Sequence, residues 1–305
     1  MQLTLNYQNK LEPIFIYVLD KLSNEIKNKL KDFVIENKLY TINELRIKSN
    51  SNIQLTVSNK IFNTKIWVTN EMINEIITNL CDGSIYAHIN TIRNGYISVG
   101  KGIRVGVCGK AIIENESIIS INNITSVNIR IPQKINFAAE YLQNLLSTHN
   151  YNVSVLIYSP PGVGKTTILR DLICRLSLPD VSVRHAVIDT REEITTFIED
   201  SITSDVYLSY PKGLGIELAT KSMTPQIIIC DEITSLEEAN AIMYSVRCGV
   251  SLVATTHANN FDDLINKEIL KPLLNCGTFD YALGVERSKT NKYIFSLNKL
   301  NENIR

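Results

Sequence analysis

Residues 159–167, which read Ser-Pro-Pro-Gly-Val-Gly-Lys-Thr-Thr, carry the strongest chemical signal in the chain. A β-branched apolar run of strand length, residues 153–158, precedes them, and apolar residues recur at helical spacing after them. A glycine-rich turn between a strand and a helix is typical of a phosphate-binding loop, where backbone N–H groups converge on an anion at a helix N-terminus. We therefore predict that this loop binds a nucleotide. The alternative is an ordinary Gly/Pro turn with a solvated lysine.

The residue types within the loop suggest a role for most positions. The ammonium of Lys165 would neutralise charge on the terminal phosphates, and the hydroxyl of Thr166 would ligate Mg²⁺. Glycines stand at 162 and 164, where positive φ angles are most needed. The motif normally opens with glycine, and Ser159 can take that place if its φ is negative. The residues predicted to hold the phosphates are Pro161, Gly162, Val163, Gly164, Lys165, Thr166 and Thr167.

Two carboxylates, Asp231 and Glu232, end a second apolar strand-like run, residues 226–232, and Asp231 comes 66 residues after Lys165. In parallel α/β sheets the strands are apolar throughout, and ligands bind at their carboxyl ends. We therefore expect Asp231 beside the loop as part of the magnesium shell, and Glu232 as the general base that polarises an attacking water. The alternative is a solvated acidic turn.

A third strand-like run, residues 250–257, also ends in polar residues. Thr256 and His257 are candidate sensors of the terminal phosphate, and we include His257 among the predicted nucleotide contacts. A lone histidine can equally be a hydrogen-bonded structural residue.

Composition limits the classes of function. The chain has 305 residues and 44% hydrophobic content, enough for two globular domains. Lys plus Arg and Asp plus Glu each number 31, so no overall positive field favours nucleic acid as a partner. The six cysteines show no paired short spacing, which indicates reduced thiols and no zinc site. No apolar run has the length of a membrane span, so we expect a cytoplasmic protein that is neither secreted nor membrane-spanning; peripheral membrane association stays open.

The pattern along the chain changes at about residues 131–136, where an extended segment meets Pro132. Residues 1–132 are predicted to form a smaller α+β domain. Its elements are amphipathic helices before residue 50, short strands at 45–48, 53–57 and 64–68, a helix at 70–80, and antiparallel strands at 96–99, 104–107 and 110–113 with glycine turns between them. Residues 133–305 are predicted to form an α/β domain with a central, mainly parallel sheet. Its other predicted strands are 183–189, 227–231, 250–255 and a late edge strand at 293–297.

With these residues in hand, the chain resembles the stage III sporulation protein AA family, itself similar to the type II and type IV secretion ATPases. The match spans nearly the whole chain. The segments that support the match are the phosphate loop and residues 95–97, 102–106, 128–131, 169–171, 189–194, 222–225 and 249–259. The family usually has Glu, Arg and Gly where this chain has Thr190, Lys221 and Thr234.

The resemblance implies a RecA-like P-loop ATPase that uses ATP and Mg²⁺ and acts as a ring, a hexamer, at the cytoplasmic face of a membrane channel needed for endospore formation. In secretion ATPases, arginines from the N-terminal domain of a neighbour complete the site. By that resemblance the candidates here are Arg104 and Arg130, with Arg93 third, and Glu193 would orient water or an interface arginine. Two alternatives stay open: a nucleic-acid motor of the helicase type, and a nucleotide-gated scaffold without significant turnover. A small-molecule kinase is weaker, since no acceptor-binding signature is found.

Overall fold

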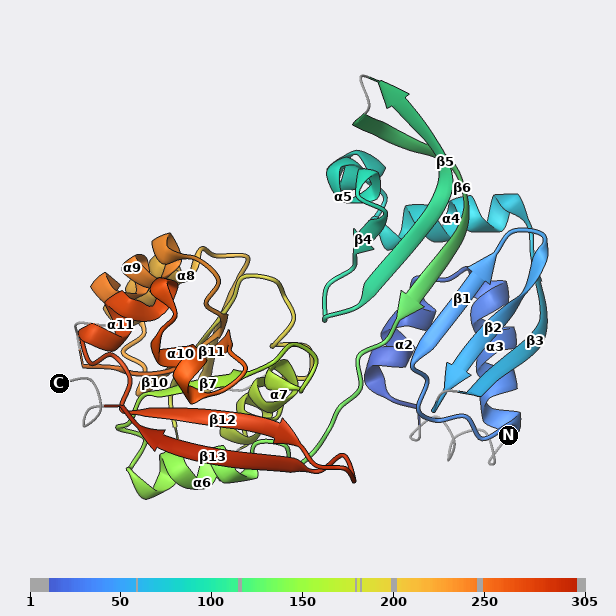
Figure 1. The fold of residues 1–305 in the computed structure, drawn as a ribbon. Coiled ribbons are helices and arrows are strands. Elements are labelled where there is room, and N and C mark those ends of the chain that lie inside the picture. Colours follow the sequence, from blue (N-terminus) through green and yellow to red (C-terminus); the bar gives the residue numbers. More distant parts are fainter. Residues whose placement is uncertain are drawn as a thin grey trace. The chain divides into compact units, whose positions relative to one another are not determined.

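The computed structural model describes residues 11–58, 60–114, 117–178, 180, 181, 183–198, 202–245 and 249–300 (Figure 1). The chain divides into two compact units, residues 1–133 and 134–305. Each unit is treated by itself below.

The first unit combines helices with one antiparallel sheet of six strands in the order β3-β2-β1-β6-β5-β4. Its strands are β1 (Glu44–Lys48), β2 (Ser51–Val57), β3 (Lys60–Val68), β4 (Tyr96–Ser98), β5 (Arg104–Glu114) and β6 (Ser117–Arg130). Its helices are α2 (Pro13–Asp20), α3 (Asn24–Glu36), α4 (Asn70–Leu80), η1 (Ile85–His88) and α5 (Ile89–Arg93).

Local chemistry explains these helices. Ile26, Leu30 and Val34 repeat every four residues on α3, and all three are buried. The Thr69 side chain accepts a hydrogen bond from the backbone N–H of Met72, which fixes the first turn of α4.

The predicted glycine turn near residue 109 is wrong, because β5 is one continuous strand from 104 to 114. The pairing of β5 with β6 becomes irregular between Cys108 and Lys110. A Cβ at Gly109 would come within 2.7 Å of the Asn122 carbonyl oxygen and 2.9 Å of the Ile124 Cα. Gly109 therefore permits a close backbone approach at a bulge rather than a turn.

The second unit is built on a seven-stranded sheet in the order β13-β12-β7-β11-β10-β8-β9. Every neighbouring pair is parallel except β12 with β13, so an antiparallel strand forms one edge. The strands are β7 (Val155–Ser159), β8 (His185–Asp189), β9 (Ser204–Leu208), β10 (Ile227–Glu232), β11 (Ser251–His257), β12 (Tyr281–Arg287) and β13 (Tyr293–Lys299). The helical segments are α6 (Glu140–Thr148), α7 (Lys165–Leu176), α8 (Lys212–Ser222), α9 (Leu236–Ser245), α10 (Phe261–Ile265), η3 (Glu268–Leu270) and α11 (Lys271–Asn275).

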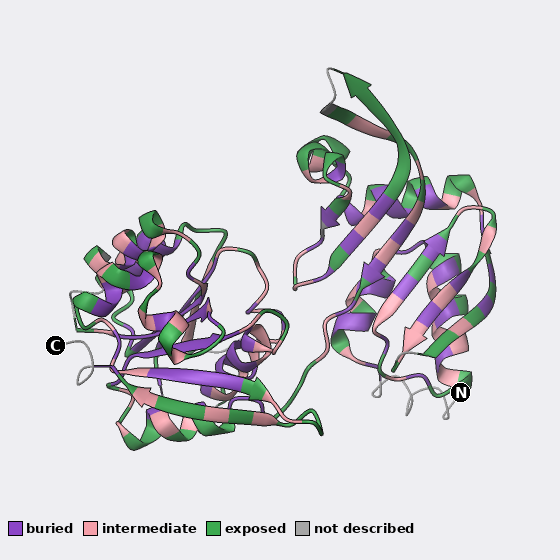
Figure 2. Cartoon of the chain, viewed as in Figure 1, coloured by how far each residue is buried: buried purple, intermediate pink, exposed green. Residues whose placement is uncertain are grey.

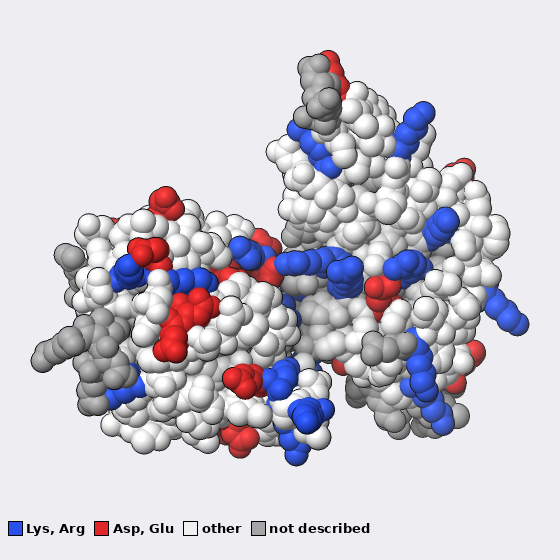
Figure 3. All heavy atoms as spheres, in the orientation of Figure 1, with Lys and Arg blue, Asp and Glu red and all other residues white. Residues whose placement is uncertain are grey.

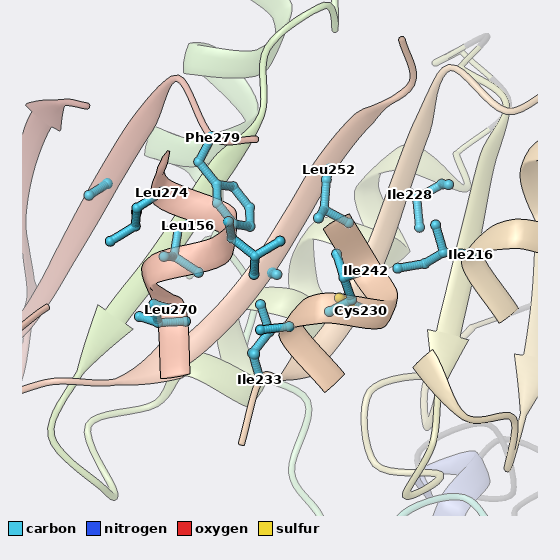
Figure 4. Close-up of a cluster of buried hydrophobic side chains, with 14 of the residues drawn as sticks. Leu156, Ile216, Ile228, Cys230, Ile233, Ile242, Leu252, Leu270, Leu274 and Phe279 are labelled. Carbon is cyan, nitrogen blue, oxygen red and sulfur yellow. The ribbon is translucent and has the colours of Figure 1, made fainter. Parts of the chain in front are cut away.

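Strands β7 and β8 are buried along their whole length, and β10 and β11 are buried up to their last residue. Figure 2 colours buried residues purple. Alternate residues of β10 enter two different cores: Ile228 and Cys230 pack in one, and Ile227 and Ile229 in the other. Figure 4 shows the first core, where helical residues such as Ile242 cover the sheet. Helices on both faces explain why the strands are apolar throughout. The strands are thereby fixed rigidly, and their carboxyl ends carry the site.

Within the described residues, no helix combines the length and apolar character needed to cross a membrane. Five cysteines there are free thiols, at positions 81, 108, 174, 230 and 276, whereas Cys248 falls outside the described part of the chain.

Candidate active site

A cavity of about 230 Å³ lies where the carboxyl ends of β7, β11 and β10 meet. These strands are parallel neighbours, so residues far apart in sequence arrive at one edge of the sheet. The sequence-predicted residues that line the cavity are Gly162, Gly164, Lys165, Thr166, Thr167, Glu193, Asp231, Glu232 and His257. Among the described residues, Pro161 and Val163 share the loop but do not line this cavity.

The loop between β7 and α7 has the backbone of an anion site. Gly162 and Gly164 have φ angles of 78° and 120°, as expected from the sequence. Ser159 is absent from the residues with positive φ among those described, so serine fits the first position of the loop without strain. Helix α7 begins at Lys165, which places its N-terminal N–H groups beside the cavity.

A chain of three side chains crosses the cavity. The Lys165 Nζ lies 2.6 Å from the His257 Nδ1, and the His257 Nε2 lies 3.0 Å from a carboxylate oxygen of Glu232. An ammonium can only donate, so Nδ1 accepts and Nε2–H donates to Glu232. Lys165 also donates to the carbonyl oxygen of Ser159 at 3.0 Å.

Burial lowers the pKa of Lys165 to about 8; the negative charge of Glu232 opposes this shift, and the positive charge of Lys267 adds to it. A bound phosphate would offset the same penalty, because it supplies opposite charge in the same cavity. The charge and burial of Lys165 therefore suit this cavity to an anion.

Lys212 is a buried residue of the site that sequence reasoning missed. Its Nζ lies 2.8 Å from the Asp231 Oδ1 and also pairs with Glu238. Lys212 and Asp231 expose only 4% and 7% of their surface, so the ion pair is shielded from water. Burial raises the pKa of Asp231, and the adjacent ammonium of Lys212 opposes that effect. No sequence spacing links residues 212 and 231; only the packing of α8 beside α9 and β10 brings them together.

Asp189 organises the segment that follows β8. Its carboxylate accepts hydrogen bonds from the backbone N–H groups of Glu193, Ile194 and Thr195 and from the Thr195 hydroxyl, at 2.8–2.9 Å. Asp189 is completely buried, so these four donors replace its hydration. This arrangement places Glu193 at the cavity, together with Arg191, which was not predicted from the sequence.

The residues at the cavity suit a magnesium ion that accompanies a phosphate ligand. The Thr166 hydroxyl and the carboxylates of Asp231, Glu232 and Glu193 supply the hard oxygen donors that Mg²⁺ prefers. Across the described chain, no group of three or more His, Cys, Asp or Glu side chains is arranged to hold a metal by itself.

The predicted arginines belong to the first unit. Arg104 and Arg130 are exposed, and they are direct cross-strand partners at the base of the β5–β6 hairpin. Arg93 is also exposed, and its Nε donates to the Ile119 carbonyl oxygen at 3.1 Å.

Comparison with known proteins shows the family of this chain. A sequence model described as "Sporulation stage III, protein AA" matches residues 15–298. Stage III sporulation protein AA of Bacillus subtilis is 31% identical over 283 residues, which cover 89% of this chain and 91% of that protein. An Arabidopsis thaliana protein, SEEDLING PLASTID DEVELOPMENT 1, is 29% identical over 177 residues, 55% of this chain and 25% of its own length.

Solved structures show a similar fold. The pilus retraction motor PilT with bound ADP superposes with a TM-score of 0.61 at 12% identity, covering 89% of this chain and 83% of its own. The ATPase DotB of Legionella pneumophila gives a TM-score of 0.58 at 13% identity, covering 88% and 78%. The fold is thus that of α/β secretion ATPases, and the chain belongs to the stage III sporulation protein AA family.

Proposed function

We propose that the protein hydrolyses ATP, with residues 133–305 as a RecA-like P-loop ATPase domain behind a smaller α+β domain of residues 1–132. One observation carries the proposal: Lys165, His257 and Glu232 form a continuous chain across one cavity, between a phosphate loop and a carboxylate fit to act as a base. A protein that only binds nucleotide has no need of that carboxylate.

In the proposed reaction, the loop N–H groups and Lys165 hold the β- and γ-phosphates. Glu232 accepts a proton from the attacking water, whose oxygen bonds to the γ-phosphorus as the bond to the bridging oxygen of ADP breaks. When bound, Mg²⁺ supplies positive charge to the phosphates, and Thr166 and Asp231 would hold it. His257 donates to Glu232 and orients its carboxylate.

Measuring phosphate release tests the assignment of Glu232 as the general base. Glu232→Gln keeps the size and one acceptor oxygen, so it should bind ADP normally while hydrolysis falls by about 100-fold or more. The matched control is Glu237→Gln, which changes an exposed carboxylate on the adjacent helix. If Glu232→Gln hydrolyses ATP as fast as the parent protein, Glu232 is not the base.

We further propose that the active form is a ring, a hexamer, in which Arg104 and Arg130 reach the phosphates bound by a neighbouring copy. Both side chains are exposed on the sheet of the first unit, which supports this role. Mass measurement with and without ATP tests the assembly. Mixing Arg130→Ala protein with Glu232→Gln protein tests the trans arrangement, because only mixed interfaces would combine an intact arginine with an intact base.

The expected result is partial recovery of hydrolysis in the mixture and none in either variant alone. Arg46→Ala is the control, since Arg46 is exposed on the same sheet and pairs with Glu44. A mixture without recovery would place Arg130 in the copy whose phosphate it contacts, and full hydrolysis by Arg130→Ala protein alone would place it outside the reaction. Family membership supports action in spore formation, and we propose the cytoplasmic face of a membrane channel as the working location.

On the face in view, Figure 3 shows acidic and basic side chains interspersed over the second unit, which does not favour nucleic acid as a partner.

A further inference from the structure

Two side chains of the edge hairpin β12–β13 contact the back of the phosphate loop. The Arg287 Nε donates to the carbonyl oxygen of Val163 at 2.9 Å, and the Tyr293 hydroxyl lies 3.5 Å from the carbonyl oxygen of Gly164. Arg287 and Tyr293 face each other across the strand pair, and the guanidinium carbon of Arg287 lies 3.6 Å from the centre of the Tyr293 ring. We call this stacked pair the loop clamp.

The clamp determines where the loop N–H groups point. In a trans peptide the C=O and the following N–H point in opposite directions. Holding the Val163 carbonyl at the back of the loop therefore directs the Gly164 N–H to the other side, and holding the Gly164 carbonyl does the same for Lys165. Gly164 and Lys165 both line the cavity on that other side. The Gly164 carbonyl also accepts the backbone N–H of Ile168 in α7 at 3.0 Å. The clamp thus fixes the Gly164 donor, and together with α7 it fixes the Lys165 donor, that a phosphate oxygen would use.

The clamp is itself held firmly. The Arg287 Nη1 donates to the Asn291 carbonyl oxygen at 2.8 Å, which closes the turn of the hairpin around the guanidinium. Behind Tyr293, Phe295 stacks at 5.9 Å between ring centres, and Tyr141 of α6 stacks on Phe295 at 5.0 Å. The clamp is therefore part of a rigid aromatic layer, not a pair of loose surface side chains.

Gly164 shows how closely the clamp fits. A Cβ on Gly164 would overlap the Tyr293 hydroxyl and lie 3.0 Å from the Arg287 Nη2. The φ of 120° excludes other residue types from this position on backbone grounds as well. The loop and the clamp thus require the same glycine for two separate reasons.

We propose that Arg287 and Tyr293 are positioning residues that preorganise the phosphate loop before nucleotide arrives. The inference rests on the proposed nucleotide-binding function. The role of the clamp is to order the loop N–H groups before a phosphate arrives. The free-energy cost of that ordering then does not reduce the affinity for the ligand.

Two measurements test the clamp. Arg287→Ala should weaken ADP binding by about 10- to 100-fold, because a charge-assisted hydrogen bond to the loop is lost. In the ligand-free protein, amide hydrogen exchange should accelerate in the peptide of residues 162–167 while β11 and residues 168–176 of α7 keep their protection. A general loss of structure would accelerate exchange in all three.

The controls come from the same hairpin. Glu286 and Ile294 are exposed cross-strand partners next to the clamp, so Glu286→Gln and Ile294→Thr should leave ADP affinity and loop exchange unchanged. If Arg287→Ala does not fold, Arg287→Lys keeps the charge but loses the planar stack and should show the same effects in reduced form. ADP affinity within twofold of the parent and unchanged loop exchange in the folded Arg287 variant would overturn the clamp. Absence of ADP binding by the parent protein would instead overturn the proposed function.

Discussion

The ammonium of Lys212 lies 2.8 Å from a carboxylate oxygen of Asp231, and both groups are almost completely withdrawn from solvent. Lys212 also pairs with Glu238, so one cation contacts two acidic groups at the cavity. Buried pairs of this kind cost much desolvation to form, yet removing one partner leaves an unbalanced charge.

Lys212→Met should therefore destabilise the folded protein by about 3–5 kcal/mol, as measured by urea unfolding followed by far-UV circular dichroism. Lys221→Met on the same helix is the control, because Lys221 pairs with Glu217 at the surface and its loss should cost about 1 kcal/mol or less. Equal costs for the two variants would show that the Lys212 pair contributes nothing beyond a surface pair.

Nucleotide affinity should fall as pH rises above about 8. Burial lowers the pKa of Lys165 to about 8, whereas bound phosphate would favour the charged form and raise the pKa. Binding then takes up a proton above pH 8, and ADP affinity falls by up to tenfold per pH unit until the pKa of Lys165 in the complex is reached.

Titration calorimetry in buffers of different ionisation enthalpy would measure the proton uptake. Lys165→Arg stays charged, so its affinity should not depend on pH over this range. The same slope in both proteins would assign the titration to another group.

His257→Ala should lower ATP hydrolysis by about 10- to 100-fold, because Glu232 loses the donor that orients it. ADP affinity should change little, since Lys165 retains its contacts with the Ser159 and Pro160 carbonyl oxygens. Steady-state phosphate release and equilibrium binding separate the two effects. Asn259→Ala removes an exposed side chain two residues further on and serves as the control. A loss of ADP affinity without a change in the maximal rate would make His257 a binding residue instead.

Asp189→Asn should destabilise the protein by about 2–3 kcal/mol, because an amide nitrogen would replace one acceptor oxygen in a cluster of four donors. Hydrolysis should fall as well, since the segment that carries Glu193 loses its anchor. Denaturant unfolding measures the first effect. Glu192→Gln lies in the same segment and can still accept from the Ser209 hydroxyl, so it should be close to neutral.

The elements that were predicted correctly have strong local signals. Helix α4 spans residues 70–80 as predicted, because Thr69 caps it and Ile73, Ile76, Ile77 and Leu80 form one buried face. The convergence of Lys165, Asp231, Glu232 and His257 on one cavity also followed from sequence, since apolar strands with polar ends predict a parallel sheet.

The elements that were missed depend on tertiary contacts. Strand β12 contains Gly284, which reads as a break in a strand, yet a Cβ there would overlap the Ser296 Oγ and lie 2.7 Å from the Tyr158 hydroxyl. Strand β9 is a half-exposed edge whose sequence, Ser-Asp-Val-Tyr-Leu, gives little apolar signal. The same holds for Lys212 and Arg287, whose partners lie in other elements and share no sequence spacing with them.

Strand β7, which leads into the phosphate loop, has a consequence for how the protein is made. Val155 is bonded in register to Val253 on one side and to Tyr281 on the other, so both neighbours of β7 are synthesised long after it. Most of the second unit must therefore emerge from the ribosome before β7 can pair with its neighbours. Strand pairs that are so far apart in sequence form slowly. During that interval the nascent loop has neither its sheet nor the hairpin behind it. Tyr293 of the loop clamp lies in β13, so the loop has all its supporting contacts only once synthesis has passed that strand.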